Sequence, residues 1–338
     1  MRIVLDAMGS DRHPEPEVHA AVRAARMWPE DTIILVGQEA KVRPLLDPLQ
    51  PPANLHFVHA DEVFAMTDKP GETVRRKPNT SMAVGMRLVK DGQADAFVTA
   101  GNTGGALANA LFILGRIRGV RRPGLIAPFP TRTGGQVLVI DVGANAECKP
   151  EYLVQFAIMG SVYARVALGI ENPRVGLLSN GEEAGKGNDL VKTTYPLLAE
   201  SGLNFIGNVE PKETFGGHVD VVVTDGFTGN VFLKTSEAVA KLLTDVLKEQ
   251  LLASPRTKLG ALLAKPAFDH LKAMLDPRRQ GAVPLLGING LVFVGHGRSD
   301  ADAIFSALNT ARQAVAQNLL QRLREAIAER LRTSQGSA

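Results

Sequence analysis

Cysteine is almost absent from this 338-residue chain, which contains only Cys148. A single thiol cannot form an internal disulfide bond or a zinc site built from several cysteines. Aromatic residues make up only 5% of the sequence, and none flanks the basic run Arg75–Lys77. Because nucleic-acid surfaces combine basic patches with interleaved aromatic side chains, we expect no nucleic-acid partner.

Long apolar runs are also missing. None approaches the roughly 18–20 residues that span a bilayer. At the N-terminal end, Asp6 follows only three apolar residues, whereas a secretory signal has an apolar core of about 7–15 residues. We therefore expect a cytoplasmic protein. The formal net charge of +3 is mild and is compatible with an acidic partner or an anionic membrane surface.

Short apolar runs followed by glycine-rich turns dominate the sequence, which is 45% apolar and 22% charged. Runs without polar alternation are typical of strands buried on both faces, as in a parallel sheet covered by helices. The hairpin signal Gly134-Gly135 indicates that the sheet is mixed. Expected strands span 2–6, 32–36, 54–59, 95–99, 124–129, 136–141, 174–179, 204–207, 219–224 and 291–294. Expected helices lie near 15–28, 80–91, 103–117, 150–168, 188–201, 229–252 and 300–332. This alternation predicts a doubly wound α/β fold in one domain, 1–338.

Residues 235–280 interrupt the α/β alternation, because they contain no strand signal. Apolar residues with helical spacing occur before and after a short segment, 255–266. We expect two amphipathic helices that project from the sheet and are joined by a short tip.

Glycine and asparagine follow several expected strands, where ligands bind in open α/β sheets. The turn 100–105 contains Asn102, Thr103 and Gly104. Its backbone N–H groups and side chains can hold an anion, or Thr103 can simply cap the next helix. The turns 141–147, with Asn145, and 225–230, with Asp225 and Asn230, have the same composition. We expect the three turns to lie at one sheet edge and to form an anion-binding or acyl-binding cleft.

The loop 179–189 resembles a nucleotide-binding P-loop only superficially. Three residues separate Gly181 from Gly185-Lys186, and Gly187 stands where a metal-binding Ser or Thr is needed. We therefore reject ATP binding. Lys186 is either a mobile cation beside an anionic substrate or a solvated surface lysine.

Two further turns contain ionisable residues. His296 stands between two glycines after a strand, so it can transfer protons or merely bond the turn. Asp6 and Asp11 stand at the two ends of the first turn. Two carboxylates without a matching His or Glu pattern are weak support for a metal site. We keep Asp6 as a candidate substrate-binding residue and expect no metal.

The run Arg75, Arg76 and Lys77 precedes Thr80 and Ser81 at an expected helix start. Such a run suits a phosphate or an acidic partner, or it is a solvated loop. Cys148 has no histidine near it in sequence, and a catalytic thiol needs an adjacent base. A structural thiol is therefore the favoured interpretation.

Taken together, these motifs closely resemble the bacterial acyl-ACP:phosphate acyltransferase family. They appear in the order of that family, from Arg2 to about Phe305. The matching stretches are 6–11, 75–78, 100–104, 141–145, 181–187, 205–210, 224–231, 284–290 and 296–297.

The resemblance implies a homodimeric α/β/α fold similar to phosphate acetyltransferases and to isocitrate and isopropylmalate dehydrogenases. It implies conversion of long-chain acyl-ACP and inorganic phosphate into acyl phosphate and free ACP, without a cofactor. The active-site lysine and asparagine of the family fall on Lys186 and Asn230, and His296 is a third candidate. Arg75, Arg76 and Lys77 then become candidates for docking the acidic ACP.

Two rival functions remain open. A decarboxylating NAD-dependent dehydrogenase of similar fold would need an aspartate cluster for a metal and an adenosine pocket, and neither is recognisable. A non-enzymatic membrane scaffold would not need the polar turns.

The segment 255–266 has three leucines, three cations and no acidic residue. We expect Leu259, Leu262 and Leu263 to enter the boundary of an anionic membrane. There the product would reach a membrane glycerol-3-phosphate acyltransferase. The alternative is that these leucines complete a four-helix dimer contact.

Overall fold

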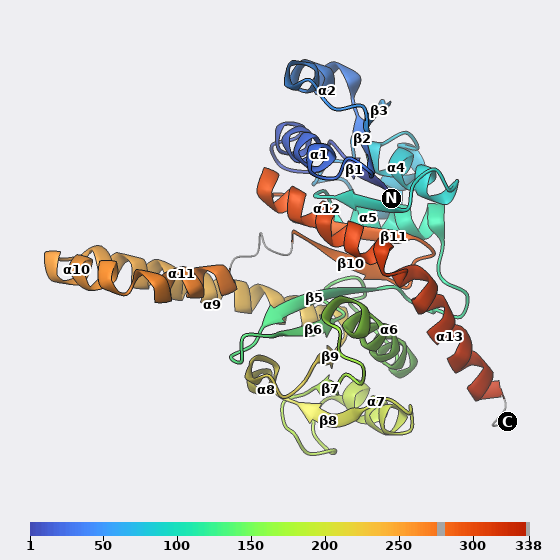
Figure 1. The fold of residues 1–338 in the computed structure, drawn as a ribbon. Helices are drawn as coiled ribbons and strands as arrows, with labels where there is room; N and C mark the ends of the chain where they lie inside the picture. The colour runs from blue at the N-terminus through green and yellow to red at the C-terminus, as the bar shows by residue number, and fades with distance from the viewer. Residues whose placement is uncertain (276–280, 336–338) are drawn as a thin grey trace.

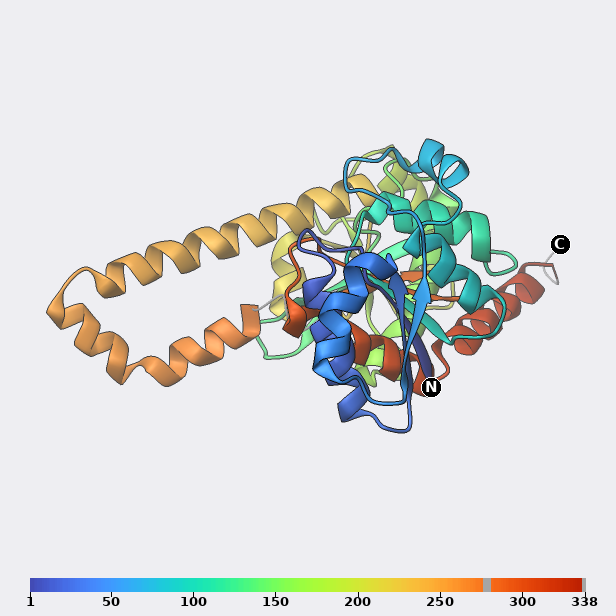
Figure 2. The same ribbon diagram turned by 90° about the horizontal axis from the view of Figure 1, so that it is seen from above.

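A mixed eleven-stranded sheet forms the middle layer of the protein (Figures 1 and 2). The computed structural model describes residues 1–275 and 281–335. In spatial order the strands are β3 (Leu55–His59), β2 (Thr32–Gly37), β1 (Arg2–Asp6), β4 (Ala96–Thr99), β11 (Leu291–Gly295), β10 (Ala282–Leu286), β5 (Gly124–Pro130), β6 (Gln136–Ile140), β9 (Val221–Val223), β7 (Val175–Leu178) and β8 (Phe205–Val209).

Helices cover both faces of this sheet, because successive residues of the apolar strands enter two separate cores. In β4, for example, Val98 joins one core and Phe97 the other. One face carries α1 (Glu15–Met27), α2 (Glu39–Leu46), α6 (Pro150–Leu168), α7 (Asp189–Ala199), α12 (Ala301–Ala316) and α13 (Leu319–Gln335). The other carries α3 (Pro70–Arg76), α4 (Ser81–Lys90), α5 (Thr103–Asn109), the π-helical turn Ala110–Leu114, α8 (Pro211–Gly216) and the start of α9 (Gly226–Leu252). The expected three-layer α/β/α architecture is confirmed.

Strand direction reverses in the middle of the sheet. Three consecutive pairings, β11 with β10, β10 with β5 and β5 with β6, are antiparallel. Strands β1, β4 and β11 therefore end at one edge, here called the Thr99 edge. Strands β6, β9, β7 and β8 end at the opposite edge, here called the Asp141 edge. The expectation that turns 100–105, 141–147 and 225–230 share one edge is wrong for the first of them.

Strand β10 was not expected from the sequence. It contains Pro284, which lacks the N–H that a central strand normally donates, and it follows a segment that has no strand signal. The expected hairpin at Gly134-Gly135 is confirmed, since β5 and β6 pair antiparallel around it.

Helix α9 continues beyond the sheet into a long projection (Figure 2). It is followed by α10 (Pro255–Leu263) and α11 (Lys265–Leu275). The expected projection is confirmed for the described residues, but the segment expected to be a short tip forms a helix of its own. Residues 276–280 of the expected stretch lie outside the described part. None of the described helices is long and apolar enough to cross a membrane.

Buried carboxylates organise the turn after β1 at the Thr99 edge. Asp6 accepts hydrogen bonds from Met8 N at 3.0 Å and from Thr99 Oγ1 at 2.7 Å. Glu17 is completely buried in α1, and its Oε1 accepts from Ser10 N at 2.8 Å. Burial raises the pKa of Glu17 from 4.5 to about 7.

The variant Glu17→Gln should therefore change the pH dependence of stability. Because its folded-state pKa is raised, Glu17 stabilises the fold through its bound proton below about pH 4.5, and this contribution is lost as the pH rises through about 7. Relative to Glu17→Gln, the wild type should lose up to about 3 kcal/mol of unfolding free energy between pH 4.5 and pH 8. Urea unfolding at several pH values measures the difference. The exposed Glu15→Gln is the control, and an equal, pH-independent difference for both variants would contradict the expectation.

Candidate active-site groove

A groove of about 2180 Å³ lies on the α5 and α9 face of the sheet. Over the sheet, its floor is made by the middle strands β5, β10 and β11, and its walls come from α5, α8 and α9. The same cavity continues along the projection, where residues of α9, α10 and α11 line it. The floor side chains are apolar: Leu125, Ala127, Phe129, Leu285 and Val294. Phe129, Phe215 and Phe232 form a cluster with ring centroids 5.2–6.1 Å apart. The groove can therefore hold a long apolar group.

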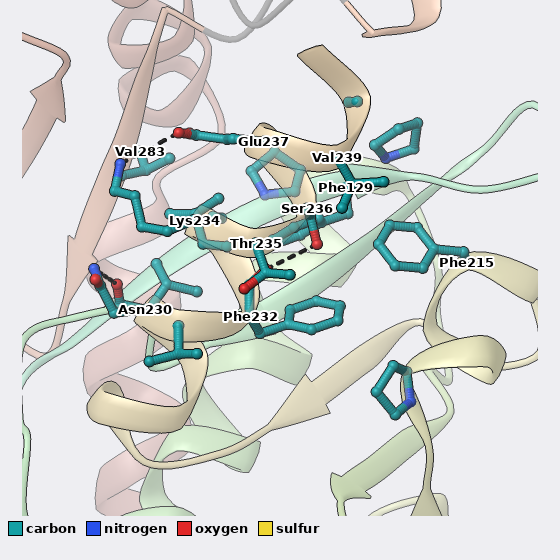
Figure 3. Close-up of a pocket in the computed structure, with 18 of the residues that line it drawn as sticks. Phe129, Phe215, Asn230, Phe232, Lys234, Thr235, Ser236, Glu237, Val239 and Val283 are labelled. Atoms are coloured by element: carbon teal, nitrogen blue, oxygen red, sulfur yellow. Dashed lines mark hydrogen bonds and ion pairs between the residues drawn. The ribbon is translucent and has the colours of Figure 1, made fainter. Parts of the chain in front are cut away.

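Helix α9 connects the two sheet edges across this groove. It begins at the Asp141 edge, where Asn230 Nδ2 donates to Val142 O at 3.0 Å. Two turns later, Glu237 lies 3.8 Å from His296 of the Thr99 edge. Figure 3 shows Asn230, Lys234 and Glu237 along the same side of the helix. The groove thus brings together turns that the sheet topology separates.

Asp141 holds the turn that supports the start of α9. Its buried carboxylate accepts hydrogen bonds from the backbone N–H groups of Leu125, Gly143, Ala144 and Asn145 at 2.8–3.1 Å, and from Asn145 Nδ2 at 2.8 Å. Burial raises the pKa of Asp141, and these donors oppose the rise. Asn145 Nδ2 also donates to Pro123 O at 2.7 Å. The predicted substrate-binding residue Asn145 is therefore engaged in the turn and does not line the groove.

Two glycines allow α9 to approach this turn closely. A Cβ at Gly229 would collide with the main-chain oxygen of Asp141, and one at Gly226 would lie 2.6 Å from Asn145 O. Side chains at either position would push the helix away. The close approach fixes Asn230, which is exposed in the groove and uses one N–H of Nδ2 on Val142 O. Among the described residues the second N–H of Nδ2 has no hydrogen-bond partner, so it can serve a ligand.

Asp225 is the N-cap of α9. Its Oδ1 accepts from Thr228 N at 2.8 Å, and its Oδ2 accepts from Thr228 Oγ1 at 2.7 Å. Asp225 lines the groove, but its carboxylate is engaged by these two donors. It orients the helix that carries Asn230.

Lys186 lies on the loop between β7 and α7, at the Asp141 edge. The side chain is exposed, and its Cγ would be 2.8 Å from a Cβ at Gly181, so the stem folds back over its own loop. Lys186 does not line the groove, whereas the following residues Gly187 and Asn188 do. The side chain must swing over the mouth of the groove to reach a ligand there.

A single lysine ties this loop to α8. Lys212 Nζ lies 3.0 Å from Glu182, 2.9 Å from Glu210 and 3.5 Å from Glu213. These three carboxylates also have the spacing of a possible metal site, but each of them is already ion-paired with Lys212 Nζ. Their arrangement is explained as an ion-pair network.

At the Thr99 edge, Asn102 rather than Thr103 caps α5. Its Oδ1 accepts from Gly105 N at 2.9 Å, and its Nδ2 donates to Met66 O at 2.9 Å. Thr103 and Gly104 line the groove, but Asn102 does not. Asp6 is buried below this turn and bonded to Thr99. Asn102 and Asp6 therefore shape the edge, while Thr103 and Gly104 face the groove.

His296 lines the groove with a side chain that is 46% exposed. Partial burial lowers its pKa, and the nearby Glu237 opposes this shift. Lys234 and Glu237 were not found from the sequence, although both line the groove. The available signal was helical spacing, because Lys234 lies four residues after Asn230 and so shares its face.

The basic run lies at the end of α3, a helix that packs against the groove helix α5. Arg75 and Arg76 are exposed. Lys77 is engaged internally, since its Nζ lies 2.7 Å from Asp68 Oδ2. Thr80 caps α4, since its Oγ1 accepts from Ala83 N at 3.2 Å. The run is therefore partly helical rather than a loop, with two cations directed to solvent.

Cys148 and the tip leucines have contrasting environments. Burial raises the pKa of the Cys148 thiol to about 11, which disfavours the nucleophilic thiolate. Leu259, Leu262 and Leu263 of α10 are 60%, 67% and 77% exposed. These leucines have little contact with the rest of the chain.

Comparison with known proteins relates the whole chain to one family. A family model described as "Fatty acid synthesis protein" matches residues 1–322. A phosphate acyltransferase from Elusimicrobium minutum is 47% identical and covers 97% of this chain and 96% of its own. One from Myxococcus xanthus is 48% identical over 92% of this chain and 89% of its own. One from Desulfitobacterium hafniense is 45% identical over 96% of this chain and 97% of its own.

Solved structures support the fold. A phosphotransacetylase from Streptococcus pyogenes superposes with a TM-score of 0.59 at 20% identity and covers 94% of each chain. A branched-chain phosphotransacylase from Enterococcus faecalis gives a TM-score of 0.56 at 16% identity and covers 93% of this chain and 100% of its own. The likeness to these structures concerns the fold alone, whereas the family match and the curated relatives span nearly the whole sequence. The chain belongs to the fatty acid synthesis protein family, whose relatives named here are phosphate acyltransferases.

Proposed function

We propose that this acyltransferase of fatty acid and phospholipid synthesis transfers a long-chain acyl group from acyl-ACP to inorganic phosphate. The single observation that supports this best is the composition of the groove. A long apolar floor meets a polar end at Asn230, so an acyl chain and an anion can be held side by side. The products would be acyl phosphate and free ACP.

The reaction needs positioning more than activation of a protein nucleophile. A phosphate oxygen attacks the thioester carbonyl carbon, the new C–O bond forms, and the C–S bond breaks. The thiolate of the carrier leaves and takes up a proton. Phosphate is already nucleophilic at neutral pH, so preorganised donors and proximity supply the catalysis. We assign no covalent acyl-enzyme, and the pKa of about 11 makes Cys148 unsuitable for that role.

Three residues carry the proposed chemistry. Asn230 Nδ2 donates its second N–H to the developing oxyanion, because its first already fixes the side chain on Val142 O. Lys186 swings from its exposed loop to neutralise the phosphate or the oxyanion. His296 orients phosphate from the Thr99 edge. No cofactor or metal is assigned to any step.

The acyl carrier would dock beside the groove, at the Thr99 edge. Arg75 and Arg76 present two exposed cations on α3, which packs against α5. An acidic carrier is attracted to such a patch. Lys77 belongs to the same run, but it is paired with Asp68 and would contribute less to carrier docking.

The projection would serve both dimerisation and membrane contact. Apolar residues of α9 such as Val239, Leu243 and Val246 remain exposed in one chain, which suits the helical projection of a second copy. The tip α10 would then bring its leucines, with Arg256, Lys258 and Lys265, to the cytoplasmic membrane. At the membrane, a glycerol-3-phosphate acyltransferase would use the acyl phosphate that this enzyme produces.

Lys186→Ala should reduce kcat about 100–1000-fold, the usual cost of losing one group that stabilises charge in the transition state. Stability should change by about 0.5 kcal/mol or less, because the side chain is exposed. Acyl phosphate formation from purified acyl-ACP and phosphate measures the effect, with thermal melting alongside. Lys192→Ala, on the exposed side of α7, is the matched control. Near-normal turnover of Lys186→Ala would remove Lys186 from the mechanism.

Reversing Arg75 and Arg76 to Glu should raise the KM for acyl-ACP and flatten its salt dependence, because exposed charges steer association and are screened by ions. The control is the double reversal Arg165→Glu and Arg322→Glu on the other face of the sheet. An increase confined to the KM for phosphate would instead place Arg75 and Arg76 in the anion site.

Triple substitution of Leu259, Leu262 and Leu263 by Glu should abolish sedimentation with anionic liposomes and leave dimerisation and turnover in solution intact. The control replaces the exposed body residues Leu45, Leu197 and Ile206 by Glu. Loss of the dimer would assign the leucines to the dimer contact. Unchanged liposome binding would show that they do not serve membrane attachment.

A further inference from the structure

One carboxylate that lines the groove near the Thr99 edge has three nitrogen-bearing side chains around it. Glu237 Oε2 lies 3.3 Å from Lys234 Nζ and 3.8 Å from Arg298 Nη2, and its Oε1 lies 3.8 Å from His296 Nε2. The cations come from two elements, α9 and the turn after β11. Lys234 and Glu237 are joined by a dashed line in Figure 3. We call these four residues the Glu237 cluster.

The cluster holds its cations loosely. Strong charge-assisted hydrogen bonds measure about 2.7–2.9 Å, as in the pairs Lys241–Asp245 at 2.7 Å and Arg174–Asp220 at 2.8 Å of this chain. All three distances around Glu237 are longer. Two permanent cations and a histidine share one carboxylate, so positive charge is in excess within the cluster.

The position of the cluster relates it to the reaction. Lys234 follows Asn230 by one helical turn, which places side chains about 5–6 Å apart on one face. Lys234, Glu237 and His296 line the groove together with the apolar residues Val283 and Val294. An anion bound here would lie at the boundary of the apolar floor, one to two helical turns from the proposed oxyanion donor Asn230.

We propose that Lys234, His296 and Arg298 form a binding site for a phosphate group, with Glu237 as the counter-ion that the phosphate displaces. An ammonium, a guanidinium and an imidazole together offer several N–H donors to the oxygens of one tetrahedral oxyanion. The phosphate group is either inorganic phosphate or the phosphodiester of the carrier's prosthetic arm. The choice of these two molecules as candidate ligands rests on the proposed function.

Phosphate binding without turnover tests the site directly. Calorimetric titration of the intact protein with inorganic phosphate should show at least a tenfold weaker Kd for Lys234→Met. Glu237→Gln should tighten the Kd about threefold to tenfold, because the competing carboxylate is gone. Lys241→Met, which removes an ordinary ion pair from the same helix, should leave the Kd unchanged. Lys234→Arg keeps the charge and should retain most of the binding.

The two sources give different patterns. If inorganic phosphate is the ligand, its Kd and its KM change together in Lys234→Met. If the phosphodiester is the ligand, the Kd and KM for phosphate are unchanged, while the KM for acyl-ACP rises in Lys234→Met and falls in Glu237→Gln. Either pattern supports the site.

Two outcomes would overturn the proposal. One is no change in phosphate binding or in either KM for Lys234→Met. The other is that Glu237→Gln weakens binding as Lys234→Met does, which would make the cluster a structural ion-pair network. Absence of acyl phosphate formation by the wild type would instead reject the proposed function. The phosphate titration would then still decide whether the cluster binds inorganic phosphate.

Discussion

The close contact between the start of α9 and the Asp141 turn is the constraint on which the site depends. The Asp141 carboxylate gathers the backbone N–H groups of its own turn and of β5, and Gly229 allows the helix to rest directly on the main chain of that turn. This contact sets the position of Asn230 and the direction of α9. The wall of the groove, Lys234 and the projection all follow from that direction.

The reversal of strand direction gives the groove two chemically different ends. Parallel strands normally collect their polar turns at one edge. Here the antiparallel strands β10 and β5 place those turns at opposite edges, and a face of apolar side chains lies between them. A helix crossing that face is needed to complete a site, and α9 fills this role. An apolar chain and an anion can consequently be bound along one continuous surface.

Continuous apolar runs made most strands and the layered fold predictable from sequence, whereas side-chain roles were harder to assign. Asn102, Asn145 and Asp225 stand at strand ends as expected, yet each is engaged in capping or turn bonds, because short polar side chains satisfy nearby backbone groups first. Lys234 and Glu237 escaped notice because His296 and Arg298, the partners of Glu237 across the groove, lie some sixty residues later. Strand β10 escaped because Pro284 interrupts its pattern. Long-range pairing leaves no local signal of this kind.

Helix α9 has a mechanical consequence, since one uninterrupted helix of 27 residues forms both the groove wall and an arm of the projection. At 1.5 Å per residue it is about 40 Å long. It is anchored by a backbone contact at one end and extends into solvent at the other, so it acts as a lever with its pivot beside Asn230. A tilt of about 5° at the pivot displaces the far end by about 3 Å. Whatever surface holds the tip therefore also restrains the angle at which α9 crosses the groove.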